Sequence, residues 1–262
     1  MPAQLELKMK LDANFGNQAQ LDKFYANVPN HLHQAVHKTN EDLCKQKFDT
    51  HLSGSTMTSV LFDRNTIFTA NAGDSRAVLY SFNKAQGGMK ITPLTEDHKP
   101  CMPVEKRRVL ECGGRVDAIK GSQGQNLGPM RVWLKDADTP GLAMSRSMGD
   151  GLAHSVGVST DPEIKRFELT QDDKFIIVAS DGVWEFLSNH DIAKIVWPFY
   201  IKNTPEQAGN AIVRAAAQTW RDNDTVIDDI TCVTIFLEVD QSVPHFPTAV
   251  LGKPILNPSS EY

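Results

Sequence analysis

The chain has 262 residues, of which 40% are hydrophobic and 23% are charged, enough for one large domain or two small ones with a sizeable core. The formal net charge of -5 gives no support for nucleic-acid binding, and no apolar run suggests a membrane span or a secretory signal. The four cysteines, Cys44, Cys101, Cys112 and Cys232, lack a C-x-x-C spacing. Reduced thiols of a cytoplasmic or nuclear protein are therefore expected, rather than disulfides or a zinc site.

The N-terminal part predicts a weakly ordered start over residues 1–20, followed by a helix. From 21 to about 47, apolar residues recur at helical spacing, and Pro29 is expected to interrupt the helix. His33 and His37 are four residues apart on this stretch, so they could share a face and bind metal. No glutamate lies between them in a zinc-protease arrangement, and we interpret them as exposed polar residues of the helix.

Three short apolar runs over 56–62, 66–71 and 76–82 then predict an antiparallel meander. A helix is expected over 103–112, because Pro103 suits a first turn and Gly113 suits the position after a helix. Residues 115–129 resemble a Gly-rich loop, and 130–134 a strand.

The most distinctive stretch is 175–179, which is continuously apolar and rich in β-branched residues, a pattern typical of a strand buried on both faces. Helices are expected from Ser188 to about 197 and from Thr204 to about 222, followed by a strand over 230–239. Residues 241–262 contain four prolines and predict a loosely held tail. Because strands and helices occur in separate blocks, an α+β fold with antiparallel sheets is favoured over a parallel sheet.

Three short acids, Asp74, Asp181 and Asp228, lie at the ends of predicted strands. Mg2+ and Mn2+ prefer oxygen ligands, so acids held by neighbouring strands could form a shared metal site that activates water and clamps a phosphoryl group. Ordinary turn chemistry is the other explanation for an Asp-Gly pair after a strand, and spacing alone leaves both open. Asp74 is expected on the same rim as Asp181, as an exposed turn acid that adds little to stability.

Several short motifs occur in a fixed order over most of the chain. They are SGST at 53–56, AGDSR at 72–76, DHKP at 97–100, Glu105, GGRV at 113–116, PGLAMSRSMGD at 140–150, DPE at 161–163, ASDGVW at 179–184 and DDIT at 228–231. Together they resemble the metal-dependent protein serine/threonine phosphatases of the type 2C (PPM) family. The segment RVWL at 131–134 resembles members from plants and protists.

The resemblance implies a sandwich of two antiparallel β-sheets flanked by helices (αββα), forming a partial phosphatase-like domain over 21–240. It implies that Asp181 and Asp228 hold a core pair of Mg2+ or Mn2+ ions, and that Asp74 with Asp181 holds a further, weaker ion. Such a protein hydrolyses phosphoserine and phosphothreonine esters of proteins with a metal-activated water, and we identify no catalytic residue beyond the metal ligands. Asp229 stands where the family usually has Asn. A monomer without nucleic-acid or membrane partners is expected.

One family feature is absent from the sequence. The family's N-terminal part carries an Asp-Gly-His-Gly segment whose Asp bridges both metals, and no Asp-Gly-His occurs here. We therefore expect an N-terminally incomplete member of the family. Its phosphatase activity should be at least about 100-fold lower than that of a version extended upstream, because even the loss of a residue that only supports a metal ligand lowers metal affinity or activity 10–100-fold. The alternative is a catalytically inactive, phosphatase-like binding module. A third interpretation, an unrelated two-metal nuclease, would need a stripe of basic residues to bind nucleic acid, and the net charge does not suggest one.

Overall fold

The structure is a computed structural model that describes residues 18–83, 85 and 87–239. The weakly ordered start expected over 1–20 lies mostly outside these residues, and the tail expected over 241–262 lies entirely outside them. The domain boundaries drawn from the sequence therefore stay predictions. Within the described residues, no helix is both long enough and apolar enough to cross a bilayer.

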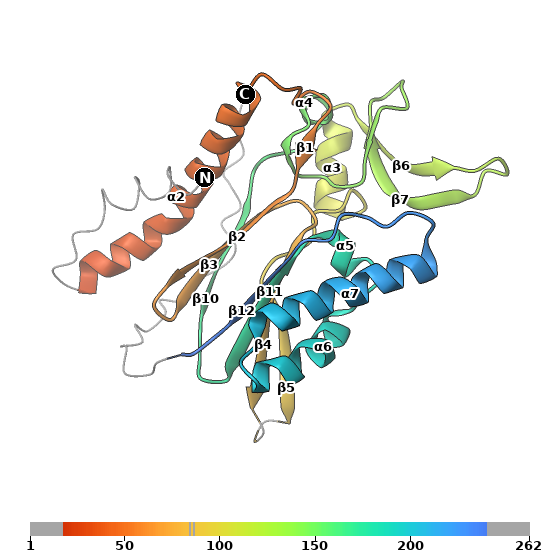
Figure 1. The fold of residues 1–262 in the computed structure, drawn as a ribbon. Helices are drawn as coiled ribbons and strands as arrows, with labels where there is room; N and C mark the ends of the chain where they lie inside the picture. The colour runs from red at the N-terminus through yellow and green to blue at the C-terminus, as the bar shows by residue number, and fades with distance from the viewer. Residues whose placement is uncertain (1–17, 84, 86, 240–262) are drawn as a thin grey trace.

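Two antiparallel sheets form the centre of the molecule, and helices cover their outer faces (Figure 1). The first sheet has the strand order β10 (Glu163–Glu168), β3 (Thr66–Ala72), β2 (Met57–Asp63). The second has the order β12 (Cys232–Phe236), β11 (Asp173–Ala179), β4 (Arg76–Asn83), β5 (Gly88–Pro93). Helix α2 (Gln18–Cys44) covers the first sheet, and α6 (Asn189–Ile201) and α7 (Pro205–Asn223) cover the second. The α+β sandwich expected from the sequence is confirmed.

The central strand β11 contributes to two of the apolar layers. Phe175 and Ile177 face α6 and α7, whereas Ile176 faces the first sheet, because successive strand residues point to opposite sides. All three side chains are fully buried. This confirms the prediction of a strand covered on both faces.

Helix α2 continues through Pro29, so the interruption expected there does not occur. Val28 and Leu32, on either side of the proline, are fully buried in the layer that contains Phe68 of β3. Burying side chains of this size stabilises by about 1.5–3 kcal/mol each, which offsets the roughly 3 kcal/mol cost of an interior proline. Helix α6 begins as predicted, with a reciprocal cap between Ser188 and Asp191.

The predicted meander is wrong in its third strand. Strand β2 pairs with β3, but β4 pairs with β11 and β5 in the other sheet. The chain crosses between the sheets at Gly73, whose φ of +124° favours glycine, and a Cβ there would meet the Thr56 side chain at 2.4 Å. The crossing places Asp74 where the two sheets meet, and apolar periodicity carries no signal for such a change of sheet.

The segment interpreted as a loop over 115–129 is instead mostly a β-hairpin, and strands β5 and β10 were also not predicted. The hairpin joins a third strand, and with two short helices it packs around buried Val109 and Val132. Its elements are α3 (Pro103–Glu111), β6 (Arg115–Lys120), β7 (Asn126–Trp133), β8 (Pro140–Leu142) and α4 (Gly151–His154). A short pair formed by β1 (Gly54–Ser55) and β9 (Met148–Gly149) lies beside them.

Candidate metal centre at the end of the central sheet

The strand register brings the three candidate metal ligands, Asp74, Asp181 and Asp228, to one end of the second sheet. Ala179, the last residue of β11, pairs with Arg76 at the start of β4 and with Cys232 at the start of β12. Asp181 follows β11, while Asp74 and Asp228 shortly precede β4 and β12. Because β11 runs antiparallel to both neighbours, its end and their beginnings meet, and the three loops emerge together.

The loops carrying Asp181 and Asp228 are in direct backbone contact. Ser180 N donates to the carbonyl of Thr231 at 3.0 Å, and Ser180 Oγ donates to the carbonyl of Asp229 at 3.1 Å. Gly182, at the start of the short helix α5 (Asp181–Trp184), packs so closely that a Cβ would lie 2.3 Å from the Asp229 carbonyl oxygen. The glycine of the Asp-Gly pair is therefore needed for this close approach and not only for a turn.

The electrostatics show that the carboxylates act on one another. Burial, together with the negative charges of Asp74 and Asp228, raises the pKa of Asp181 to about 6. A divalent cation would neutralise the negative charge that Lys99 leaves uncompensated, and carboxylate oxygens are the donors that Mg2+ and Mn2+ prefer. The residues present therefore fit a hard divalent ion, although the ligand assignment of the three aspartates stays a prediction.

Asp74 differs from the exposed turn acid expected from the sequence. Its side chain is only 2% exposed, and its Oδ2 accepts a hydrogen bond of 2.5 Å from Lys99 Nζ. Burial alone would lower the pKa of Lys99, but the charges of Asp74, Asp181 and Asp97 raise it overall. The ammonium group thus supplies positive charge to the acid cluster, in the way a bound cation would.

Lys99 and its neighbour His98 are site residues that the metal-ligand prediction missed. The signal was present, since both lie in the DHKP segment at 97–100 that carried part of the family resemblance. His98 is buried and its Nδ1 accepts from Gly73 N at 3.1 Å. Burial, with the charge of Arg146, lowers the pKa of His98 to about 3, so it is a neutral group that ties the segment to the turn before Asp74.

Three ion pairs involving Asp97 and Glu105 surround the acid cluster. Arg76 binds Asp97 in a bidentate pair of 2.8 and 2.6 Å. Glu105 of α3, nearly fully buried, accepts hydrogen bonds from Arg108 and Arg146. Burial would raise the pKa of Glu105, but the two guanidinium groups hold it well below its usual range. The bidentate, charge-assisted pair of Arg76 and Asp97 thus joins the strand that follows Asp74 to the segment that carries Lys99.

The fold and the acid-lined edge define the class of an αββα sandwich with a candidate metal centre at one end. Residues 4–224 match the family described as protein phosphatase 2C. The chain belongs to the protein phosphatase 2C family.

Named relatives agree with this assignment. The chain is 34% identical over 239 residues to probable protein phosphatase 2C 73 of Arabidopsis thaliana, covering 90% of this chain and 61% of the relative. It is 41% identical over 199 residues to probable protein phosphatase 2C 64 of Oryza sativa subsp. japonica, covering 75% and 44%. The chain thus spans less than two thirds of the length of these relatives.

Solved structures support the fold. The serine-threonine phosphatase 2C from Toxoplasma gondii matches with a TM-score of 0.66 at 21% identity, covering 91% of this chain and 76% of that one. A C. elegans sex determining protein matches with a TM-score of 0.60 at 21% identity, covering 89% and 50%. At this identity the likeness concerns the fold alone.

Proposed function

We propose that this chain hydrolyses phosphoserine and phosphothreonine esters of proteins, with Mg2+ or Mn2+ held by Asp181, Asp228 and Asp74. The observation that supports the proposal best is the convergence of these three aspartates from neighbouring strands; burial, together with the charges of Asp74 and Asp228, raises the pKa of Asp181. Both relatives named above carry the name probable protein phosphatase 2C, so the inactive binding module is not the favoured alternative. We further propose a monomer in the cytoplasm or nucleus that does not bind nucleic acid or membranes.

The charge of the site explains why a cation is required. A phosphate monoester is an anion, and it would be repelled by three carboxylates, of which Asp74 is paired with Lys99. A bound divalent ion supplies the positive charge that attracts the phosphoryl group and activates water. The chain's own residues hold and orient that ion: Asp181 and Asp228 from loops in backbone contact, and Asp74 from a buried position fixed by Lys99.

The test is phosphate release from a phosphothreonine peptide during a Mn2+ titration. Asp181→Asn keeps the side-chain shape but removes the charge, so we expect activity to fall by at least about 100-fold, since weaker perturbations at metal sites cost 10–100-fold. The matched control is Asp222→Asn, an exposed acid in the last turn of α7, which should retain activity. A chelator should abolish the wild-type rate.

Two results would contradict the proposal. One is equal activity of Asp181→Asn and Asp222→Asn, and the other is turnover that survives chelation. A wild-type chain that binds Mn2+ but releases no phosphate would favour the binding-module interpretation instead.

A further inference from the structure

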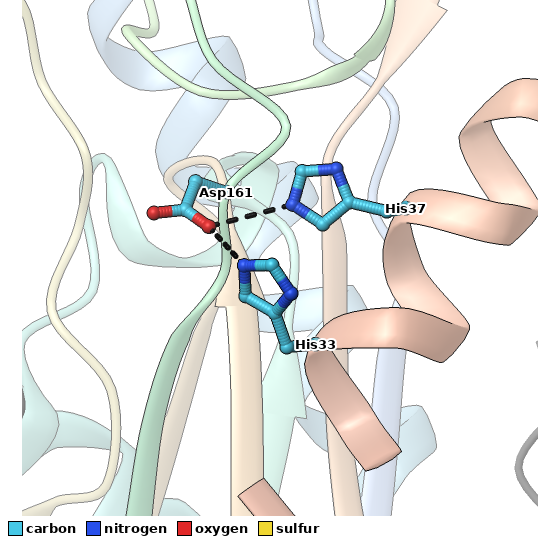
Figure 2. A group of neighbouring side chains, drawn as sticks. All are labelled: His33, His37 and Asp161. Carbon is cyan, nitrogen blue, oxygen red and sulfur yellow. Dashed lines mark hydrogen bonds and ion pairs between the residues drawn. The ribbon is translucent and has the colours of Figure 1, made fainter. Parts of the chain in front are cut away.

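A second cluster of possible metal ligands shares no residue with the candidate metal centre. It lies where helix α2 meets the segment that leads into β10 (Figure 2). His33 Nε2 and His37 Nε2 lie 2.6 and 3.4 Å from one oxygen, Oδ1 of Asp161. The two imidazole rings lie side by side, with centroids 4.3 Å apart. Their spacing of four residues puts them on one face of the helix, and all three ligand atoms lie within 4.8 Å of one another.

Both halves of this cluster are held in place by other contacts. The backbone N–H of Asp161 donates to Ser159 Oγ at 3.0 Å, and its carbonyl oxygen accepts from Arg146 Nη1 at 2.8 Å. Helix α2 is anchored to the first sheet through the buried side chains that include Val28 and Leu32. A set of ligands carried by rigid elements needs little rearrangement to bind an ion.

The distances suit a tetrahedral ion. Nitrogen and oxygen ligands bind zinc at about 2.0–2.2 Å, which places them about 3.4 Å from one another. The separation of His37 Nε2 and Asp161 Oδ1 is already 3.4 Å. The separation of His33 Nε2 and Asp161 Oδ1 is 2.6 Å and must open by about 0.8 Å to match this geometry. The side chains of His33 and Asp161 are both more than one third exposed and can rotate.

A hydrogen bond alone explains only part of the arrangement. The 2.6 Å contact is a good hydrogen bond between His33 and Asp161, but the 3.4 Å contact of His37 exceeds the usual range. The second ring nevertheless points the same nitrogen at the same oxygen (Figure 2). Convergence of two imidazoles on one carboxylate is the donor set of zinc-like ions, whereas Mg2+ favours oxygen alone.

We propose that His33, His37 and Asp161 form a binding site for a zinc-class divalent transition ion that fastens α2 to the sandwich. The ion joins residues 124 and 128 positions apart in the sequence, so it stabilises the docking of the helix. The partial exposure of the cluster leaves a fourth position for water. This inference is independent of the proposed phosphatase function, since its test measures ion binding and helix protection rather than turnover.

The test is calorimetric titration of zinc into the full chain, with excess Mg2+ present to occupy sites made of oxygen ligands. His37→Gln and Asp161→Asn should each bind zinc at least about 10–100-fold more weakly than the wild type. The control is His190→Gln, which removes an exposed histidine from helix α6 and should bind as the wild type does. His37→Gln should also fold normally, because the contact that it loses is not a short hydrogen bond.

Two further measurements locate the ion. Cobalt should give the visible absorption of a tetrahedral site in the wild type and in His190→Gln, but not in His37→Gln. Zinc should slow amide hydrogen exchange in α2 of the wild type, leave α7 unchanged, and have no effect on α2 in His37→Gln. A wild-type chain that binds no zinc, or zinc binding equally strong in all the variants, would overturn the proposal.

Discussion

The charge on Asp181 is predicted to destabilise the metal-free protein, so its removal should stabilise the fold while damaging the candidate metal centre. The pKa of this carboxyl is about 6 instead of the ordinary 3.8, and one pKa unit corresponds to 1.36 kcal/mol. The upper bound is about 3 kcal/mol, and partial exposure reduces the expected gain for Asp181→Asn to about 1–2 kcal/mol at pH 7.5.

The sign of the pH dependence follows from proton uptake. The folded state binds a proton at Asp181 more readily than the unfolded state does, so this contribution to stability falls as the pH rises from about 4 to about 6. The advantage of Asp181→Asn over the wild type should therefore be present at pH 7.5 and vanish near pH 4.

The assay is urea unfolding of chelator-treated protein at both pH values, with Asp222→Asn as the control. Saturating Mn2+ should reverse the order, because an ion at 100 times its dissociation constant stabilises the folded state by about 2.7 kcal/mol, and Asp181→Asn should lose this gain. If Asp181→Asn were less stable than the wild type in chelator, or if its stability showed the wild-type pH dependence, the electrostatic reasoning would be refuted.

Three other substitutions test the surroundings of the site. Gly182→Ala should cost about 1–3 kcal/mol in urea unfolding and weaken Mn2+ binding, because the added methyl overlaps the Asp229 carbonyl; unchanged stability would contradict the close packing. Glu105→Gln should cost about 3 kcal/mol in the same assay, because it leaves two guanidinium groups without their buried partner. His98→Asn should reduce the loss of stability between pH 6.5 and 4, because only the unfolded wild type takes up a proton there; an unaltered acid transition would exclude His98 as its source.

The elements that could be predicted from the sequence are those with a strong local signal. The central strand, the capped helix after Ser188 and the helix after Thr204 were placed correctly, since apolar periodicity and capping residues report on local structure. The strand expected over 130–134 overlaps β7, but the rest of the hairpin, over 115–129, was missed because its glycines and polar residues resemble a loop. Pro29 was expected to interrupt a helix whose tertiary packing keeps it continuous.

For the candidate site, the sequence pointed to three aspartates at strand ends, but not to how their side chains are held. Asp74 follows an apolar run and precedes another, so local patterning predicts an exposed turn between paired strands. The strands instead belong to different sheets, and the turn between them is buried. A carboxylate in such a place needs a partner, and Lys99, 25 residues later in the chain, provides it. The partner depends on tertiary structure, and the same holds for Asp161, which meets two histidines more than 120 residues away. Short acids at strand ends can thus be found by inspection of the sequence, whereas a distant partner such as Lys99 can be identified only once the sheets are assembled.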